Sequence, residues 1–491
     1  MAITQTELIS AKIAHDAGIS DIEFLALEVT EWLISNARKE MLIGEDYYSC
    51  KHDVLSRKRQ AIGADGNLIS LSNLPNNRIV DNQYAKMVDQ KKNYLLGKPV
   101  TFKANNKAYT DELKRVLGKR FMRTLKNAGE EALIGAIAWL YPYISDTGEL
   151  VFRLFPSHEI CPFWKDAAHT ELDMAARVYE VEIYNGKTKE TITKVDLFKT
   201  SGVTSYIREG TDLVPIGGEI PYITVQSGDN VEQKSFSWEK LPLIAIKYNA
   251  KEIPLIRRIK QLQDSINLIL SDFANSTEET VHNTILVLKN YDGTDLGEFR
   301  RNLATFGAIK VRTQEGIAGD VDTLNVEVSS ENYKTILTLL KKALIENARG
   351  YDAKDEKAAG STPNQMNIQS MYSDIDLDAN DTETELQAAF EDILWFVNIY
   401  LANTTKKDYR SELVEVIFNR DILINESEAI ENCEKSVGII SNETIVSMHP
   451  WTNDTAQEIK QLKEEQKEQE PSDPYSDIFE SNRTEMSGVE K

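Results

Sequence analysis

The chain has 491 residues, of which 41% are hydrophobic and 27% are charged. A length beyond about 250–300 residues predicts several modules instead of one core. The formal net charge of -22 argues against a protein that grips nucleic acid tightly by neutralising phosphates.

Membrane insertion and disulfide bonding are both unexpected. No uninterrupted apolar run of about 18 residues occurs, and the first residues have neither a basic region nor an apolar core of a secretion signal. Cys50, Cys161 and Cys433 are an odd number without a CxxC pair. This usage suits a reducing compartment and argues against a thiolate zinc site.

The N-terminal part predicts helices separated by a loop. Apolar residues from Ile22 to Leu33 recur at helical spacings, so residues 1–50 form a helical segment that ends near Gly44. The polar, glycine-containing stretch that follows is typical of a loop. Residues 76–97 then predict one helix.

The middle of the chain predicts an α+β module over residues 51–250. A helical pattern over 109–131 gives way to aromatic and β-branched residues on both sides of Asp146-Thr147-Gly148, which predicts a hairpin. Short alternating runs continue over 175–250, and polar loops are expected at 186–192 and 226–236.

A heptad pattern marks a helix over residues 251–280. Its apolar residues follow each other at spacings of 4, 3, 4, 3 and 4. This seam is too short for a free coiled coil, so it indicates either packing against a neighbouring helix or a stripe of an internal core. The seam residues are Leu255, Ile259, Leu262, Ile266, Ile269 and Phe273.

A compact α/β insert over 281–329, with TILVLKN and AIKVRT as strands, is followed by a second helix over 330–350. Residues 351–366 are small and polar and predict a mobile loop.

The C-terminal part is mostly helical. Residues 367–424 predict a long helix, broken or softened at SDIDLDANDTE, and the strand ELVEVIFN. Over 425–470 short helices alternate with caps such as Ser441, and 471–491 has the composition of a disordered tail.

Most catalytic motifs are absent from the sequence. The three Gly-Lys pairs lack the earlier glycine of a phosphate-binding P-loop, and no HExxH, HxxxH or G-x-S-x-G pattern occurs. We therefore assign no catalytic residue, no cofactor and no metal ligand.

The acidic run Asp374, Asp376, Asp378 and Glu385 has the spacing of an EF-hand calcium loop. Ala379 stands where that loop needs glycine, so a solvated acidic surface is the favoured interpretation. A two-metal nuclease site is disfavoured further, because carboxylates two residues apart do not share a helix face.

Four stretches in this order resemble portal proteins of tailed bacteriophages, in particular of long-tailed phages of Gram-positive hosts. They are residues 76–100, 129–164, 242–272 and 418–462.

The resemblance implies a multi-module α+β portal fold and a homo-oligomeric ring of about twelve subunits. It places a wing at 51–250 and 367–424, stem helices at 251–280 and 330–350, a clip at 281–329, a tunnel loop at 351–366 and a crown at 425–470. The seam would then pack against the second stem helix and the next subunit.

The implied function is a conduit for DNA packaging and ejection at one capsid vertex, not an enzyme. The implied partners are double-stranded DNA, terminase, major capsid and scaffolding proteins and a head–tail adaptor, with no membrane. The protein would lie in the virion, and in the host cytoplasm during assembly. Candidates for weak DNA contacts are Lys334, Lys341, Lys342, Lys354 and Lys357.

Two alternatives remain at this point. One is a different phage ring protein, such as a head–tail adaptor, and the other is a metal-dependent nuclease that uses the acidic run.

Overall fold

The computed structural model describes residues 20–62, 67–70, 74–227, 232–282, 285–289, 320–324, 330–352, 365–420, 426–452 and 455–469. The chain divides into two compact units: residues 1–352 with 374–421, and residues 353–373 with 422–491. Each unit is described by itself.

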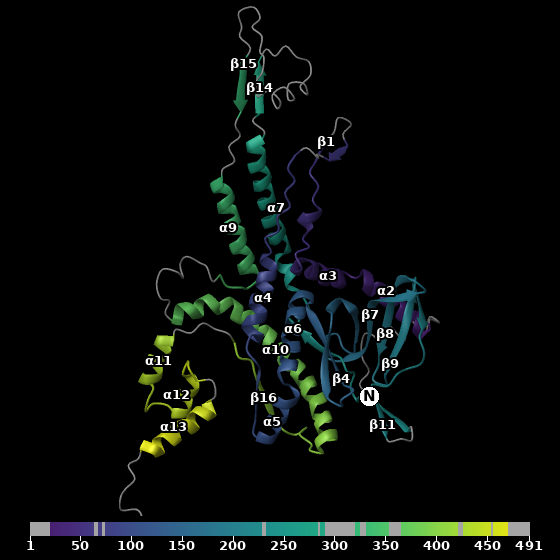
Figure 1. The fold of residues 1–491 in the computed structure, drawn as a ribbon, viewed down its shortest axis with the longest axis vertical. Helices are drawn as coiled ribbons and strands as arrows, with labels where there is room; N and C mark the ends of the chain where they lie inside the picture. The colour runs from purple at the N-terminus through teal and green to yellow at the C-terminus, as the bar shows by residue number, and fades with distance from the viewer. Residues whose placement is uncertain are drawn as a thin grey trace, which may run out of the picture. The chain divides into compact units, whose positions relative to one another are not determined.

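Helices and strands of the first unit are shown in Figure 1. Its helices are α2 (Asp21–Ile34), α3 (Asn36–Tyr48), α4 (Gln83–Leu96), α5 (Lys107–Val116), α6 (Lys119–Gly135), α7 (Leu255–His282), α9 (Ser330–Asn347) and, from Asp374 on, α10 (Gln365–Thr405). Short 3₁₀ turns are η1 (Asp53–Ser56) and η2 (Ser157–Glu159). The mixture of helices and strands confirms the predicted α+β class.

The predicted N-terminal helical segment forms two helices from Asp21 on, and its residues 1–19 lie outside the described part of the chain. Ser35 ends α2, and its side chain accepts a hydrogen bond from the backbone N–H of Arg38 at the start of α3. Such a capping serine satisfies an orphan amide of the next helix and so favours the break. The second helix runs through Gly44 to Tyr48, beyond the predicted end.

A five-stranded antiparallel sheet forms the outer part of the first unit. Its order is β10-β9-β8-β7-β6, from β10 (Asp212–Pro215), β9 (Val203–Glu209), β8 (Thr188–Phe198), β7 (Leu172–Asn185) and β6 (Ile160–Trp164). Helix α2 covers one face, where Leu25 and Val29 are buried among residues of all five strands. Burial of this apolar face stabilises the sheet.

The predicted hairpin is confirmed. It pairs β4 (Ile137–Ile144) with β5 (Leu150–Phe155), and Gly148 adopts a φ of 79° in the turn, a conformation that glycine permits. Strand β13 (Ile244–Lys247) adds to the other edge of β4.

The expected loop at 226–236 is wrong, because β11 (Ile223–Ser227) pairs there with β12 (Glu232–Phe236). The expected loop at 186–192 is also wrong, because only a tight turn separates β7 from β8, which begins at Thr188.

Helix α10 packs along the centre of this unit. Phe390 lies within 6.2 Å, between ring centroids, of Phe102, Phe121 and Phe418. The predicted strand ELVEVIFN is β16 (Val414–Ile417), and it pairs with β3 (Thr101–Ala104).

Residues 51–82, expected to be a loop followed by a helix from 76, adopt a different structure. They contain the two-stranded hairpin of β1 (Gln60–Ile62) and β2 (Leu68–Ser70), and the helix α4 begins only at Gln83. We call residues 51–82, as far as they are described, the arm.

Helices α7 and α9 form an antiparallel pair that we call the stem. Near one end of the pair the rings of Phe273 and Tyr333 lie 4.9 Å apart. At the other end, Arg258 and Arg349 both approach Asp378. Beyond α7, β14 (Ile285–Lys289), which includes most of TILVLKN, pairs with β15 (Asp320–Leu324). The predicted LGEFRRNLATF helix and AIKVRT strand lie outside the described residues.

The second unit contains α11 (Glu426–Lys435), α12 (Asn442–Met448) and α13 (Thr455–Gln469). Ser441 caps α12 through Thr444, as predicted. The predicted disordered tail lies outside the described residues. Among those described, no helix is long and apolar enough to cross a membrane.

Candidate functional site: the stem and its base

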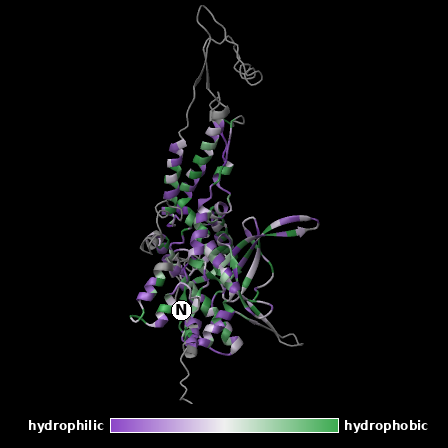
Figure 2. Ribbon diagram, turned by 60° about the vertical axis from the view of Figure 1, so that its left-hand side comes forward, coloured by the Kyte–Doolittle hydropathy of each residue, from purple (hydrophilic) through white to green (hydrophobic). Residues whose placement is uncertain are grey.

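The heptad seam lies on one side of α7. Leu255, Ile259 and Ile266 are buried, whereas Leu262, Ile269 and Phe273 are half-buried. Phe273 contacts Tyr333 of α9, and hydrophobic residues recur along both stem helices in Figure 2. The seam therefore packs partly within the chain, and its outer part keeps some exposed apolar surface.

A row of buried polar side chains lies on another side of α7. Gln263, Asn267, Ser271 and Asn275 are spaced four residues apart, and each is at most 3% exposed. We call these four residues the polar ladder. Residues at this spacing share one face of a helix, so the ladder is a second, continuous stripe beside the apolar seam.

The polar ladder binds the backbone of the arm. Side-chain oxygens of Asn275, Ser271, Asn267 and Gln263 accept hydrogen bonds from the N–H groups of Asn77, Ile79, Asp81 and Tyr84, at 2.7, 2.9, 3.0 and 2.9 Å. Four helical residues rise about 6.0 Å, and two extended residues span about 6.6 Å. The near match of these repeats explains why the alternate amides of Asn77, Ile79 and Asp81 meet successive ladder residues. Gln263 then binds the amide of Tyr84, which already lies in α4.

These bonds are the physical reason why residues 76–82 are not helical. Their amides are satisfied by α7 instead of by a helix of their own, and buried N–H groups need a partner. Asn82 then caps α4 by accepting a hydrogen bond from Ala85.

His52 closes the ladder from the other side. The Nε2 atom of His52 lies 3.1 Å from the carbonyl oxygen of Tyr47 and must be the donor, because a carbonyl only accepts. Its Nδ1 atom therefore accepts a hydrogen bond from Asn267 Nδ2, at 2.8 Å. Burial lowers the pKa of His52 below its ordinary value, so the imidazole is neutral at pH 7.

Ion pairs flank the ladder. Arg57 of the arm lies 2.7 Å from Asp272, and Lys260 of α7 bridges Asp53 of the arm and Asp264 at 2.6 and 2.8 Å. The arm is thus held to α7 by ion pairs as well as by the buried polar row.

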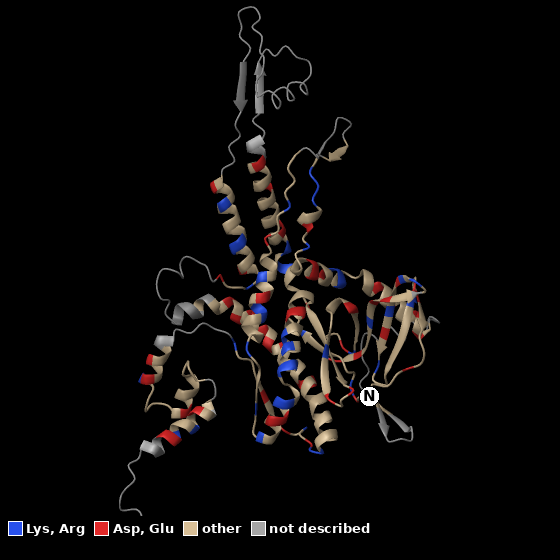
Figure 3. Cartoon of the chain, in the orientation of Figure 1, with Lys and Arg blue, Asp and Glu red and all other residues tan. Residues whose placement is uncertain are grey.

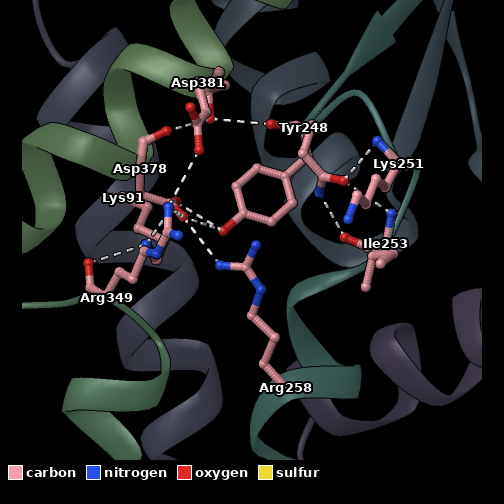
Figure 4. Close-up of polar contacts among 10 residues, drawn as sticks. Lys91, Tyr248, Lys251, Ile253, Arg258, Arg349, Asp378 and Asp381 are labelled. Atoms are coloured by element: carbon pink, nitrogen blue, oxygen red, sulfur yellow. Dashed lines mark hydrogen bonds and ion pairs between the residues drawn. The ribbon is translucent and has the colours of Figure 1, made fainter.

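At the base of the stem, five elements meet around one buried carboxylate (Figure 4). Asp378 of α10 accepts from Lys91 of α4 at 2.7 Å and from Tyr248, just after β13, at 2.7 and 2.9 Å. Arg258 near the start of α7 lies 3.1 Å away, and Arg349 just after α9 lies 3.9 Å away. We call these five residues the base cluster.

The base cluster is held in a poorly solvated place. The side chains of Lys91 and Asp378 are only 4% and 5% exposed. Burial lowers the pKa of Lys91 to about 8, although Asp378 opposes this shift. Burying a single charge costs much free energy, so the charges of Lys91 and Asp378 can be buried only because each is paired with the other. The cluster consequently ties both stem helices to α4 and α10.

The acidic run is not the solvated surface that was expected, and α10 continues through it without a break. Asp376 accepts from Arg420 at 2.7 Å and from Tyr94, Asp378 is buried in the base cluster, and only Asp374 is exposed. Cations from elsewhere in the fold neutralise Asp376 and Asp378, which is why the helix tolerates these two carboxylates. Within the described residues, no group of three or more His, Cys, Asp or Glu side chains is placed to hold a metal ion.

The five lysines proposed to contact DNA have different surroundings. Lys341 lies 2.7 Å from Asp81 of the arm, and Lys342 forms a loose pair with Glu346 at 3.9 Å. Lys334 is exposed on α9. Lys354 and Lys357 lie outside the described residues.

Sequence reasoning found the seam but missed the polar ladder and the base cluster. A stripe such as Gln263-Asn267-Ser271-Asn275 looks like the solvated face of an amphipathic helix. The one available signal was its content: it has no charged residue, although 27% of the chain is charged.

Comparison with known proteins adds the family. Residues 35–472 match the model of the family "Phage portal protein, SPP1 Gp6-like". The chain is 28% identical over 457 residues to a portal protein of Clostridium phage phiCD119, covering 90% of this chain and 96% of the relative. It is also 28% identical over 433 residues to the portal protein of Bacillus phage SPP1, covering 87% and 83%.

Among solved structures, the chain resembles one from the virion of a native gene transfer agent particle. That match has a TM-score of 0.36 and 12% identity, and covers 73% of this chain and 87% of the other. A chain from the neck of such a particle, computed with C12 symmetry, has a TM-score of 0.36 and 11% identity, with 74% and 88% covered. Since the family model spans most of the sequence, this chain belongs to the SPP1 Gp6-like family of phage portal proteins.

Proposed function

We propose that the chain assembles into a ring of about twelve subunits at one capsid vertex, through which double-stranded DNA enters and leaves. The observation that carries this proposal is the family match over residues 35–472. A portal protein belongs to the virion, and assembly in the host cytoplasm is part of the proposal.

The modules take the following roles in this proposal. The stem pair α7 and α9 lines the ring, and the insert between them, residues 281–329, is the clip that docks terminase and later the head–tail adaptor. Residues 351–366 are the tunnel loop and 425–470 the crown. The wing, 51–250 with 367–424, contacts the major capsid and scaffolding proteins.

The lysines of α9 are proposed to make weak contacts with passing DNA. Lys334 and Lys342 are exposed, whereas Lys341 is already paired with Asp81. Acidic side chains are spread through the described part of the chain in Figure 3. With a net charge of -22, the surface favours sliding over tight binding, since phosphates are attracted only locally.

Catalysis is not part of the proposal. The energy for packaging comes from ATP hydrolysis by the terminase motor, so this chain needs shape and rigidity and no reacting group. The ladder and the base cluster fit this role, because they join the stem to the body with buried polar contacts.

The test is light scattering combined with negative-stain imaging of the purified protein. Rings of about twelve 55.6 kDa subunits, with a mass of about 670 kDa and a central hole, are expected. The same preparation should neither hydrolyse ATP nor cleave DNA. A compact monomer that cleaves DNA when magnesium is added would contradict the proposal.

A further inference from the structure

The arm keeps apolar side chains on its outer side. Leu68 and Ile69 in the β1–β2 hairpin are 66% and 50% exposed, and Leu55 and Ile79 at the foot of the hairpin are also exposed. A two-stranded hairpin by itself is marginally stable in water. The arm is therefore built to be covered by something further.

One exposed side of α9 is apolar as well. Ile336 and Leu339 are 45% and 63% exposed. Because they are three residues apart, they share one face of the helix. Lys334 is two residues from Ile336, about 200° around the helix, and so points away from this face.

These two apolar surfaces lie on nearly opposite sides of α7 and at the same level. Ser271 holds the amide of Ile79, and Phe273 contacts Tyr333, one turn before Ile336. Two residues along a helix correspond to a rotation of about 200°. The arm and α9 thus flank α7, one on each side.

Charged side chains lie beside both surfaces. Lys58 and Arg78 are exposed on the arm, and neither pairs with a carboxylate within the described residues. On α9, Glu346 lies on the face of Leu339 with only the loose Lys342 contact, and the exposed Lys342 itself is three residues from Leu339 on the same side.

We propose that the arm of one subunit packs against the exposed side of α9 that carries Ile336 and Leu339 in the next subunit. A closed ring needs a head-to-tail interface, in which one side of each subunit fits a different surface on the opposite side of its neighbour. The arm and α9 meet this requirement in position and apolar character. The occupant of each surface is a second copy of this chain, so the inference rests on the proposed ring.

The first test is cross-linking between two single-cysteine variants. The background carries Cys50→Ser and Cys433→Ser and retains Cys161, which is buried and therefore unreactive. One preparation then carries Ile79→Cys and the other Ile336→Cys. Rings assembled from an equal mixture are treated with a short bis-maleimide reagent and analysed by denaturing electrophoresis.

A product at twice the chain mass is expected from the mixture and not from rings of either variant alone. The matched control pairs Ile336→Cys with Leu413→Cys, an 88% exposed wing residue, and should give no such product. Mixed rings without the product, or a product from Ile336→Cys alone, would overturn this interface and leave the ring intact. A chain that forms no rings would instead overturn the proposed function.

The second test places a charge in the interface. Leu339→Glu is expected to reduce the fraction of subunits in rings at least tenfold at equal concentration, and to leave the melting temperature of the monomer unchanged. Leu413→Glu serves as the control and should assemble normally. Normal assembly of Leu339→Glu would contradict the inference.

Discussion

Asp378 shows how one residue connects distant parts of this chain. It is buried, and its carboxylate accepts hydrogen bonds from Lys91, Tyr248 and Arg258, which come from three other parts of the chain. A buried ion pair gains little over an apolar contact of the same shape, but removing one partner is costly because the other charge stays behind. The cluster therefore specifies how the stem joins the body more than it adds stability.

Removing the charge of Asp378 should unfold the base of the stem more easily. We expect Asp378→Asn to lower the free energy of unfolding by about 3–5 kcal/mol, since the buried Lys91 loses its counter-ion. Urea unfolding of the monomer followed by fluorescence measures this. Asp374→Asn, at an exposed position, is the control and should change stability by less than about 0.5 kcal/mol. Equal effects of both variants would contradict the role of the cluster.

Lys91 should make stability depend on pH above neutrality. Its pKa in the folded protein is about 8, against 10.5 ordinarily. Between these values the unfolded chain binds more protons than the folded one, so this residue's contribution to stability rises with pH. The difference in unfolding free energy, native protein minus Lys91→Met, should therefore increase from pH 8 to pH 10. A constant difference would show that the pKa of Lys91 is not lowered.

At the scale of elements, the stem depends on the match between a helix and an extended segment. The ladder of α7 satisfies amides of the arm that would otherwise be buried without partners. The same helix uses its opposite side for α9. One helix therefore holds two neighbours by different means, with polar contacts on one side and apolar contacts on the other.

Replacing Asn267 by leucine tests the ladder. The change leaves the amide of Asp81 and the imidazole of His52 without their partner, which should cost about 1–3 kcal/mol. Hydrogen exchange of the Asp81 and Ile79 amides should accelerate accordingly. Gln261→Leu, at an exposed position of the same helix, provides the comparison and should leave both amides protected. Unchanged exchange in Asn267→Leu would mean that the ladder does not hold the arm.

At the scale of the whole molecule, net charge decides how a DNA conduit behaves. A protein with a charge of -22 repels a polyanion on average, and only local lysines oppose this. In the proposed ring, the resulting shallow attraction would suit a tunnel along which DNA moves in both directions.

Purified rings should accordingly bind double-stranded DNA weakly, and less as salt increases. In Lys334→Ala/Lys342→Ala rings, the slope of log affinity against log salt should fall in magnitude by about 1 for each phosphate that the rings no longer neutralise. Fluorescence anisotropy at several salt concentrations measures this slope. A double variant at exposed wing positions, Lys187→Ala/Lys199→Ala, should keep the original slope. An equal fall in both variants would argue against DNA binding by α9.

Local patterns in the sequence determined the elements whose residues interact with near neighbours. The Asp146-Thr147-Gly148 turn specified its hairpin, and Ser441 specified the start of a helix, because turn and cap bonds span only a few residues. The apolar seam from Leu255 to Phe273 determined the helix α7 in the same way. The portal family was inferred from the order of four stretches along the chain, which resembles that of known portal proteins.

Only the tertiary structure determines which polar residues are buried. Residues 77–81 are extended and Asp378 is buried because their partners lie far along the chain: 186 residues separate Asp81 from Asn267, and 287 separate Lys91 from Asp378. Periodicity reports which residues share a face, but a polar face is buried or solvated according to what packs on it. That partner is set by the fold as a whole, and no local pattern contains it.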